Sequence, residues 1–113
     1  MSYPRKIFPL PLRSLNFAAL VGGYIPIGSP AESSVRIAKF YNNMNKAVLI
    51  SWDGSTDHMY LPSGSFTLLD ISTNRIREDG YFIAQGQQFY VQDAGVAPTS
   101  GDIYVELYAG APY

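Results

Sequence analysis

Short runs of strand-forming residues, each ended by turn residues, are the feature that most constrains how this chain can fold. The runs are rich in Val, Ile, Phe and Tyr, and Asn, Asp, Gly, Pro and Ser separate them at short intervals. No window places apolar residues at helical spacing over three turns. The chain is therefore predicted to be all-β, a single antiparallel β-sandwich or jelly-roll of seven or eight short strands. The predicted strands are residues 35–41, 47–52, 59–61, 66–71, 81–84, 88–91 and 103–108.

Residues 1–33 differ from the rest and are predicted to form an extended N-terminal arm ahead of a β-sandwich body at 34–113. Five of the chain's eight prolines fall in this segment, and proline disfavours helices and central strands. The segment is nevertheless too apolar for a disordered tail, so we expect it to lie in a groove on its own body or on a neighbouring subunit. Residues 17–21 are a possible first strand. The apolar arm residues proposed to contact a partner are Ile7, Phe8, Leu10, Leu12 and Phe17.

Alternation along the predicted strands assigns side chains to faces, because successive strand residues point in opposite directions. In the last strand, Ile103, Val105 and Leu107 share one face and are predicted to lie in the core. Tyr104 and Tyr108 share the other face. Both faces of the strand at 47–52 are largely apolar, which indicates a central strand covered on both sides.

Composition narrows the classes of partner. Hydrophobic residues make up 47% of the chain and charged residues only 15%, against about 25% charged in an average soluble domain. Such a surface is cheap to desolvate, which favours protein contacts. The net charge is −1 and the basic residues are scattered, so no nucleic-acid partner is expected. The uncharged stretch at 15–31 contains a Gly-Gly pair and two prolines, so no membrane partner is expected either.

No catalytic residue, metal site or cofactor is predicted. The chain has no cysteine and a single histidine, His58. A hydrolytic triad would also need a serine in a strained nucleophile turn, and no serine of the chain stands in that pattern. We interpret Asp57 and His58 as capping residues of a turn. The segment from Asp53 to Asp57 resembles the start of a calcium loop, but Gly64 stands where a bidentate glutamate is needed. A hairpin turn explains these residues better, and the protein is expected not to be an enzyme.

Tyrosine is the enriched residue, with nine in the chain. A tyrosine ring is broadly apolar and its hydroxyl stays wet, so it suits protein interfaces and sugar-binding platforms, and it is also common on plain β-surfaces. Tyr104, Tyr108 and Tyr113 are the candidates for a protein interface. The alternative sugar-binding residues are Trp52, Tyr104 and Tyr108.

The stretch from Ile50 to Ile71 resembles a type of small tailed-bacteriophage virion protein. It has a strand that runs into the turn Asp-Gly-Ser-Thr-Asp-His, then a Leu-Pro-Ser-Gly turn, then a strand that ends in Asp. The likeness extends over about residues 17–110. It implies a jelly-roll or related sandwich in the capsid surface, neck or tail, without catalytic residues.

Two functions follow as expectations. The first is a structural subunit of the virion, a capsid cement or decoration protein or a neck or tail adaptor, which forms homo-oligomers and contacts other virion proteins. The alternative is a carbohydrate-binding β-sandwich module on a host-adsorption structure.

Overall fold

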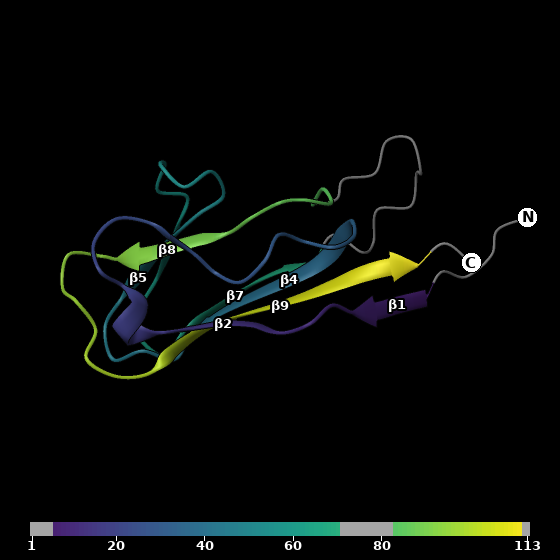
Figure 1. Ribbon diagram of the computed structural model, residues 1–113. Coiled ribbons are helices and arrows are strands. Elements are labelled where there is room, and N and C mark those ends of the chain that lie inside the picture. The colour runs from purple at the N-terminus through teal and green to yellow at the C-terminus, as the bar shows by residue number, and fades with distance from the viewer. Residues whose placement is uncertain (1–5, 71–82, 112–113) are drawn as a thin grey trace, which may run out of the picture.

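Two antiparallel sheets pack against each other in the computed structural model, which describes residues 6–70 and 83–111 (Figure 1). The described part holds nine strands, one 3-10 helix and no α-helix, which confirms the predicted all-β sandwich. Sheet A has the order β1-β9-β4-β7, with β2 also paired to β9; sheet B has the order β3-β8-β5-β6. Sheet A consists of β1 (Lys6–Pro9), β2 (Arg13–Asn16), β4 (Val35–Asn42), β7 (Phe66–Asp70) and β9 (Asp102–Ala111). Sheet B consists of β3 (Ile25–Pro26), β5 (Val48–Ser51), β6 (Met59–Leu61) and β8 (Tyr90–Asp93).

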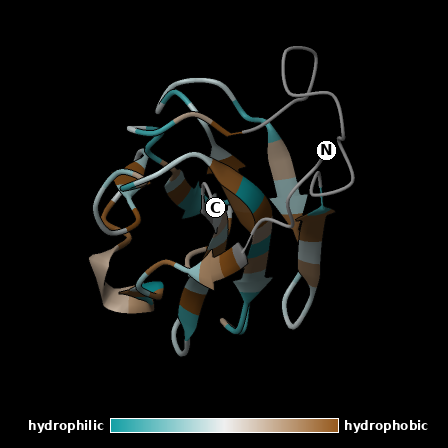
Figure 2. Cartoon of the chain, turned by 90° about the vertical axis from the view of Figure 1, so that its right-hand side faces the viewer, coloured by the Kyte–Doolittle hydropathy of each residue, from teal (hydrophilic) through white to brown (hydrophobic). Residues whose placement is uncertain are grey.

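The core lies between the sheets and follows the alternation of the strands. Hydrophobic and hydrophilic bands alternate along several strands in Figure 2. Ile103, Val105 and Leu107 are buried as predicted, and so are Val48 and Ile50 on β5, which is a central strand of sheet B. At the centre, the rings of Phe40 and Phe89 meet edge to face with centroids 5.0 Å apart. Such aromatic pairs contribute more than their buried area alone.

The apolar N-terminal segment lies along its own sheet. β1 pairs with one end of β9 and β2 with the other, so the two short strands follow each other along one edge of sheet A (Figure 1). Between them, the Leu10 N–H donates to the carbonyl of Leu107 at 2.9 Å, and the Leu10 side chain is buried. Pro9 is the last residue of β1 and Pro11 lies in the gap before β2, as expected of proline at a sheet edge.

The strand predicted at 17–21 is wrong. Residues Phe17–Ala19 form a single 3-10 turn, η1, and Leu20 N–H donates to the carbonyl of Phe17. Asn16 caps it: its side-chain oxygen accepts the Ala18 N–H at 3.0 Å. The capping bond stabilises the turn locally and outweighs the strand preference of the residues that follow.

The other predicted strands correspond to observed ones with small shifts. β4, β5 and β6 lie within a residue of the predicted ranges, and β7 matches residues 66–70 of its range, whose last residue lies outside the described part. β8 is displaced by two residues, and β9 is longer at both ends. Of the strand predicted at 81–84, residues 81 and 82 lie outside the described part, and Ile83 forms an isolated bridge with Val35. The strand at Ile25–Pro26 was not predicted, because two residues with a proline give no alternation to detect.

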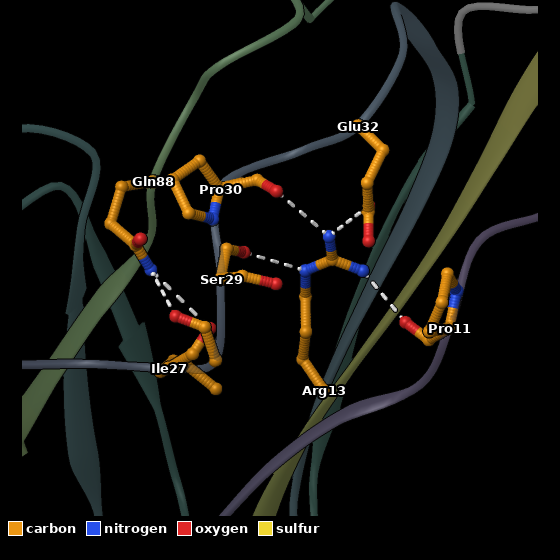
Figure 3. Close-up of polar contacts among 8 residues, drawn as sticks. Pro11, Arg13, Ile27, Ser29, Pro30, Glu32 and Gln88 are labelled. Atoms are coloured by element: carbon orange, nitrogen blue, oxygen red, sulfur yellow. Dashed lines mark hydrogen bonds and ion pairs between the residues drawn. The ribbon is translucent and has the colours of Figure 1, made fainter.

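One side of the sandwich is closed by Arg13, a charged residue of β2 that is only 4% exposed. Its guanidinium donates to the carbonyls of Pro11, Ser29 and Pro30 at 2.6, 3.0 and 3.1 Å and forms an ion pair with Glu32 (Figure 3). Ser29 and Pro30 follow the edge strand of sheet B, so the side chain joins the two sheets. Every contact satisfies a donor of the fork-shaped guanidinium, which is what burial of arginine requires.

Candidate functional site

The outer face of sheet A is a three-by-three array of side chains from β9, β4 and β7. The strand register sets its rows, because Tyr41, Lys39 and Ile37 of β4 each lie opposite one residue of β9 and one of β7. The opposite face of β9 and β4 supplies the core, so these alternate residues point outward. The rows are Tyr104–Tyr41–Phe66, Glu106–Lys39–Leu68 and Tyr108–Ile37–Asp70. Six of the nine side chains are aromatic or aliphatic.

The first row is a strip of aromatic rings. The rings of Tyr41 and Tyr104 lie 6.2 Å apart between centroids and within 15° of parallel. The Lys39 ammonium lies 4.9 Å from the centroid of the Phe66 ring and 6.0 Å from that of Tyr41. At these distances the cation is attracted to the ring faces. The side chain of Phe66 is 58% exposed and that of Leu68 is 52% exposed.

Neighbouring carboxylates bind the tyrosine hydroxyls of β9. The Tyr104 hydroxyl donates to Asp102 at 3.2 Å, and the Tyr108 hydroxyl donates to Glu106 at 3.1 Å. The negative charge of Asp102 raises the pKa of Tyr104, and the hydrogen bond to Glu106 raises the pKa of Tyr108. Both hydroxyls therefore stay protonated over the physiological range, and the carboxylates hold the two rings in fixed orientations.

A cleft of about 400 Å³ opens between the two sheets on the side away from Arg13. Trp52, His58 and Met59 line it from sheet B and its hairpin, and Thr67 and Leu69 line it from β7. Trp52 packs edge to face on the buried Phe89 ring with centroids 5.2 Å apart. Trp52 thus borders this cleft, whereas Tyr104 and Tyr108 belong to the outer face of sheet A. The three sugar-binding candidates do not form one platform.

The predicted arm residues fall into three groups. Leu12 is 61% exposed and Ile7 is also exposed, so both can meet a partner. Phe8 and Phe17 are partly buried and pack against the core. Leu10 was a wrong choice, because its side chain is in the core. Tyr113 lies outside the described residues.

The polar residues of the β5–β6 hairpin hold the turn together. The Trp52 N–H donates to Nδ1 of His58 at 3.0 Å, and the His58 N–H donates to the carbonyl of Ile50. One Asp53 oxygen accepts the N–H groups of Ser55 and Thr56, both at 2.8 Å. These backbone hydrogen bonds hold the pKa of Asp53 well below its usual range. Within residues 6–70 and 83–111, no three potential metal-ligating side chains gather.

The sequence analysis missed four apolar members of this surface, namely Ile37, Tyr41, Phe66 and Leu68. Each stands at an alternate position of a predicted strand, so its outward direction could have been read. The sequence alone does not show which strands lie side by side, because β4 pairs with β9 across more than sixty residues of chain.

Comparisons with protein-family models, curated proteins and solved structures gave no match. Within the described residues, no helix has the length and apolar character needed to span a membrane.

Proposed function

We propose that this protein is a non-enzymatic structural subunit of a multi-copy assembly, and that the assembly is a bacteriophage particle. The observation that carries the proposal is the outer face of sheet A. An antiparallel sheet with one solvated face normally alternates apolar residues inside and polar residues outside. Here six of the nine outward positions of three adjacent strands are aromatic or aliphatic, which is the pattern of a sheet that another layer covers.

The low charge of the chain supports the same proposal. Only 15% of the residues are charged, so little desolvation opposes contact over a broad surface. The bacteriophage part of the proposal depends on the likeness of the turns between Ile50 and Ile71 to those of virion proteins. Within such a particle, we propose that the subunit is a capsid cement or decoration protein, or an adaptor at the neck or tail.

The test is incorporation into particles. Particles purified from cells whose phage genome carries the gene are analysed by quantitative mass spectrometry, with wild-type chain and with Tyr104→Lys. We expect many copies per particle for the wild type and at least a tenfold loss for the variant, because the lysine places a charge in the aromatic row. The matched control is Tyr60→Lys, since Tyr60 is 61% exposed on sheet B. Absence of the wild-type chain, or equal loss in both variants, contradicts the proposal.

A carbohydrate-binding module is the second candidate, and the nearly parallel rings of Tyr41 and Tyr104 favour it. Flat aromatic surfaces stack on sugar rings, and the polar side chains of Asn43 and Asp102 at the ring hydroxyls could bind sugar hydroxyl groups. A panel of immobilised glycans tests it: binding that is lost in Tyr104→Ala and kept in Tyr60→Ala supports this function. Absence of binding at millimolar glycan rules it out.

A further inference from the structure

The four edges of the two sheets are not equally protected against pairing with another chain. In the edge formed by β1 and β2, Pro9 ends β1 and Pro11 lies between the two strands. The edge strand β3 contains Pro26. The edge strand β6 has three residues and is followed by Pro62. Prolines and short strands are the usual means of blocking edge-to-edge association. β7 has five residues, no proline and no charge in residues 66–69. It is the one described edge without these protections.

The hydrogen-bond pattern shows which backbone groups this edge offers. The Asn42 N–H of β4 donates to the carbonyl of Ser65 at 2.9 Å. Antiparallel pairing bonds alternate residues to a given neighbour, so Thr67 bonds to β4 in its turn. Phe66 and Leu68 therefore direct their N–H and C=O groups away from β4. Among the described residues, no strand pairs with that side of β7.

We propose that two copies of the chain pair through β7, antiparallel about a two-fold axis, with Leu68 of one copy opposite the partner's Leu68. The two A sheets then form one continuous sheet of ten strands, and the outer faces join into a single surface. This pairing rests on the proposed function, because it identifies a second copy of the chain as one partner of the subunit within the assembly. Leu68 is the central residue of β7, so a two-fold axis at Leu68 gives the symmetric register in which all five residues of β7 are paired.

Charge complementarity supports this register. It places the partner's Asp70 opposite Phe66, and the Lys39 ammonium lies 4.9 Å from the centroid of the Phe66 ring. Because β7 separates β4 from the partner strand, the Lys39 ammonium and the partner's Asp70 carboxylate would lie on the two sides of Phe66, and the two-fold axis creates this arrangement twice. Opposite charges at such a separation attract each other through solvent, and salt screens the attraction.

The inward side of β7 is complementary as well. In the same register the partner's Leu69 lies opposite Thr67, which lines the cleft between the sheets. The partner's side chain then covers part of the apolar opening beside Met59. Burial of apolar surface favours association, so the cleft adds an apolar contribution to the backbone hydrogen bonds.

The test is sedimentation equilibrium of the full-length chain over a concentration series. We expect a monomer–dimer equilibrium for the wild type. Leu68→Lys sets two ammonium groups against each other at the two-fold axis and should raise the dissociation constant at least tenfold, about 1.4 kcal/mol or more. The side chain is 52% exposed, so the variant is expected to fold, which circular dichroism checks. Leu12→Lys, at an exposed leucine of the opposite edge of the same sheet, should leave the constant unchanged.

A charge exchange tests the register itself. Lys39→Asp alone should weaken the dimer, and the pair of substitutions Lys39→Asp and Asp70→Lys should restore it to within a few-fold of the wild type. A wild type that stays monomeric at millimolar concentration overturns the proposal. So does a dimer that Leu68→Lys leaves intact, or a charge exchange that restores nothing.

The outcomes also separate this proposal from the proposed function. A chain that enters particles but neither dimerises nor responds to Leu68→Lys retains its role as an assembly subunit and loses the β7 pairing. A chain that dimerises through β7 but is absent from particles retains the pairing and loses the virion role. Loss of both contradicts both.

Discussion

Arg13 shows how one charged side chain can hold a small sandwich together. Arginine is seldom buried unless its donors are satisfied, and here three carbonyls and Glu32 satisfy them. The ion pair holds the pKa of Glu32 below its usual value. Gly28 passes so close that an added Cβ would lie 2.8 Å from Cγ of Arg13. The guanidinium and the loop around it therefore depend on each other.

Arg13→Ala is expected to destabilise the fold by about 2–4 kcal/mol, because it removes a buried side chain together with its three partly buried hydrogen bonds to carbonyls and its ion pair. Arg13→Lys should recover only part of this loss, since one ammonium cannot reproduce the planar fork. Urea unfolding followed by tryptophan fluorescence measures both. Glu32→Gln is the control, and it should cost much less because the Glu32 side chain is 45% exposed, whereas that of Arg13 is 4% exposed. Equal effects of Arg13→Ala and Glu32→Gln would mean that the carbonyl contacts contribute nothing.

Tyr24 gives the fold a dependence on alkaline pH. Burial and a hydrogen bond to Asp57 raise the pKa of its hydroxyl to about 12, from an ordinary value near 10. The folded state thus favours the protonated hydroxyl, so this contribution to stability is complete below about pH 10 and is lost as pH rises towards 12. Tyr24→Phe should flatten the decline in the free energy of unfolding over that window. Urea titrations at pH 9 and pH 11 measure it, and an unchanged decline would contradict the assignment.

At the scale of the element, turns decide where the strands begin. Gly101 precedes β9 with φ at +95°, and a Cβ there would lie 2.0 Å from the backbone oxygen of Asn43. The turn before β9 is therefore packed directly against the turn after β4. This contact sets the register of the longest strand pair in the molecule.

Gly101→Ala should cost about 3 kcal/mol or more, because it adds a backbone clash to the unfavourable φ. Gly95→Ala separates the two contributions: Gly95 has φ at +111° with nothing within 4 Å of an added Cβ, so only the conformational cost of about 1–2 kcal/mol applies. Thermal unfolding of both variants makes the comparison. Equal losses would show that the loop at Asn43 moves aside without cost.

The elements also show what a single sequence can and cannot predict. Strands with clear alternation, such as β9, were predicted together with their buried face. The turn at Phe17–Ala19 was not, because one side-chain cap at Asn16 decided the local conformation. The aromatic row of Tyr104, Tyr41 and Phe66 combines three distant strands. Alternation assigns each ring a direction but says nothing about its neighbours.

At the scale of the whole molecule, the two sides of the sandwich are unlike each other. Arg13 and Leu10 close the side formed by β1, β2 and β3, and proline interrupts its edges. The side formed by β6 and β7 keeps an apolar cleft and an edge without proline. On the proposed β7 pairing, this asymmetry would restrict association to one side, and a two-fold contact there would give a closed dimer and not an open fibre.

The same asymmetry predicts that the N-terminal segment is part of the folded unit and not a removable arm. Removal of residues 2–16 takes β1 and β2 from β9 and removes Leu10 and Arg13 from the interior. The burial of Leu10, the partial burial of Phe8 and Leu15 against the core, and the Arg13 bonds together approach the roughly 5–15 kcal/mol that stabilises a domain of this size. We expect the truncated chain to be unfolded or aggregated at 25 °C, with the β-sheet circular dichroism signal and the cooperative urea transition both lost. Removal of residues 2–5, which precede β1, is the matched control and should leave the urea midpoint nearly unchanged. A truncated chain that keeps its cooperative transition would instead make residues 6–16 an arm that the body can release, free to bind a neighbouring subunit.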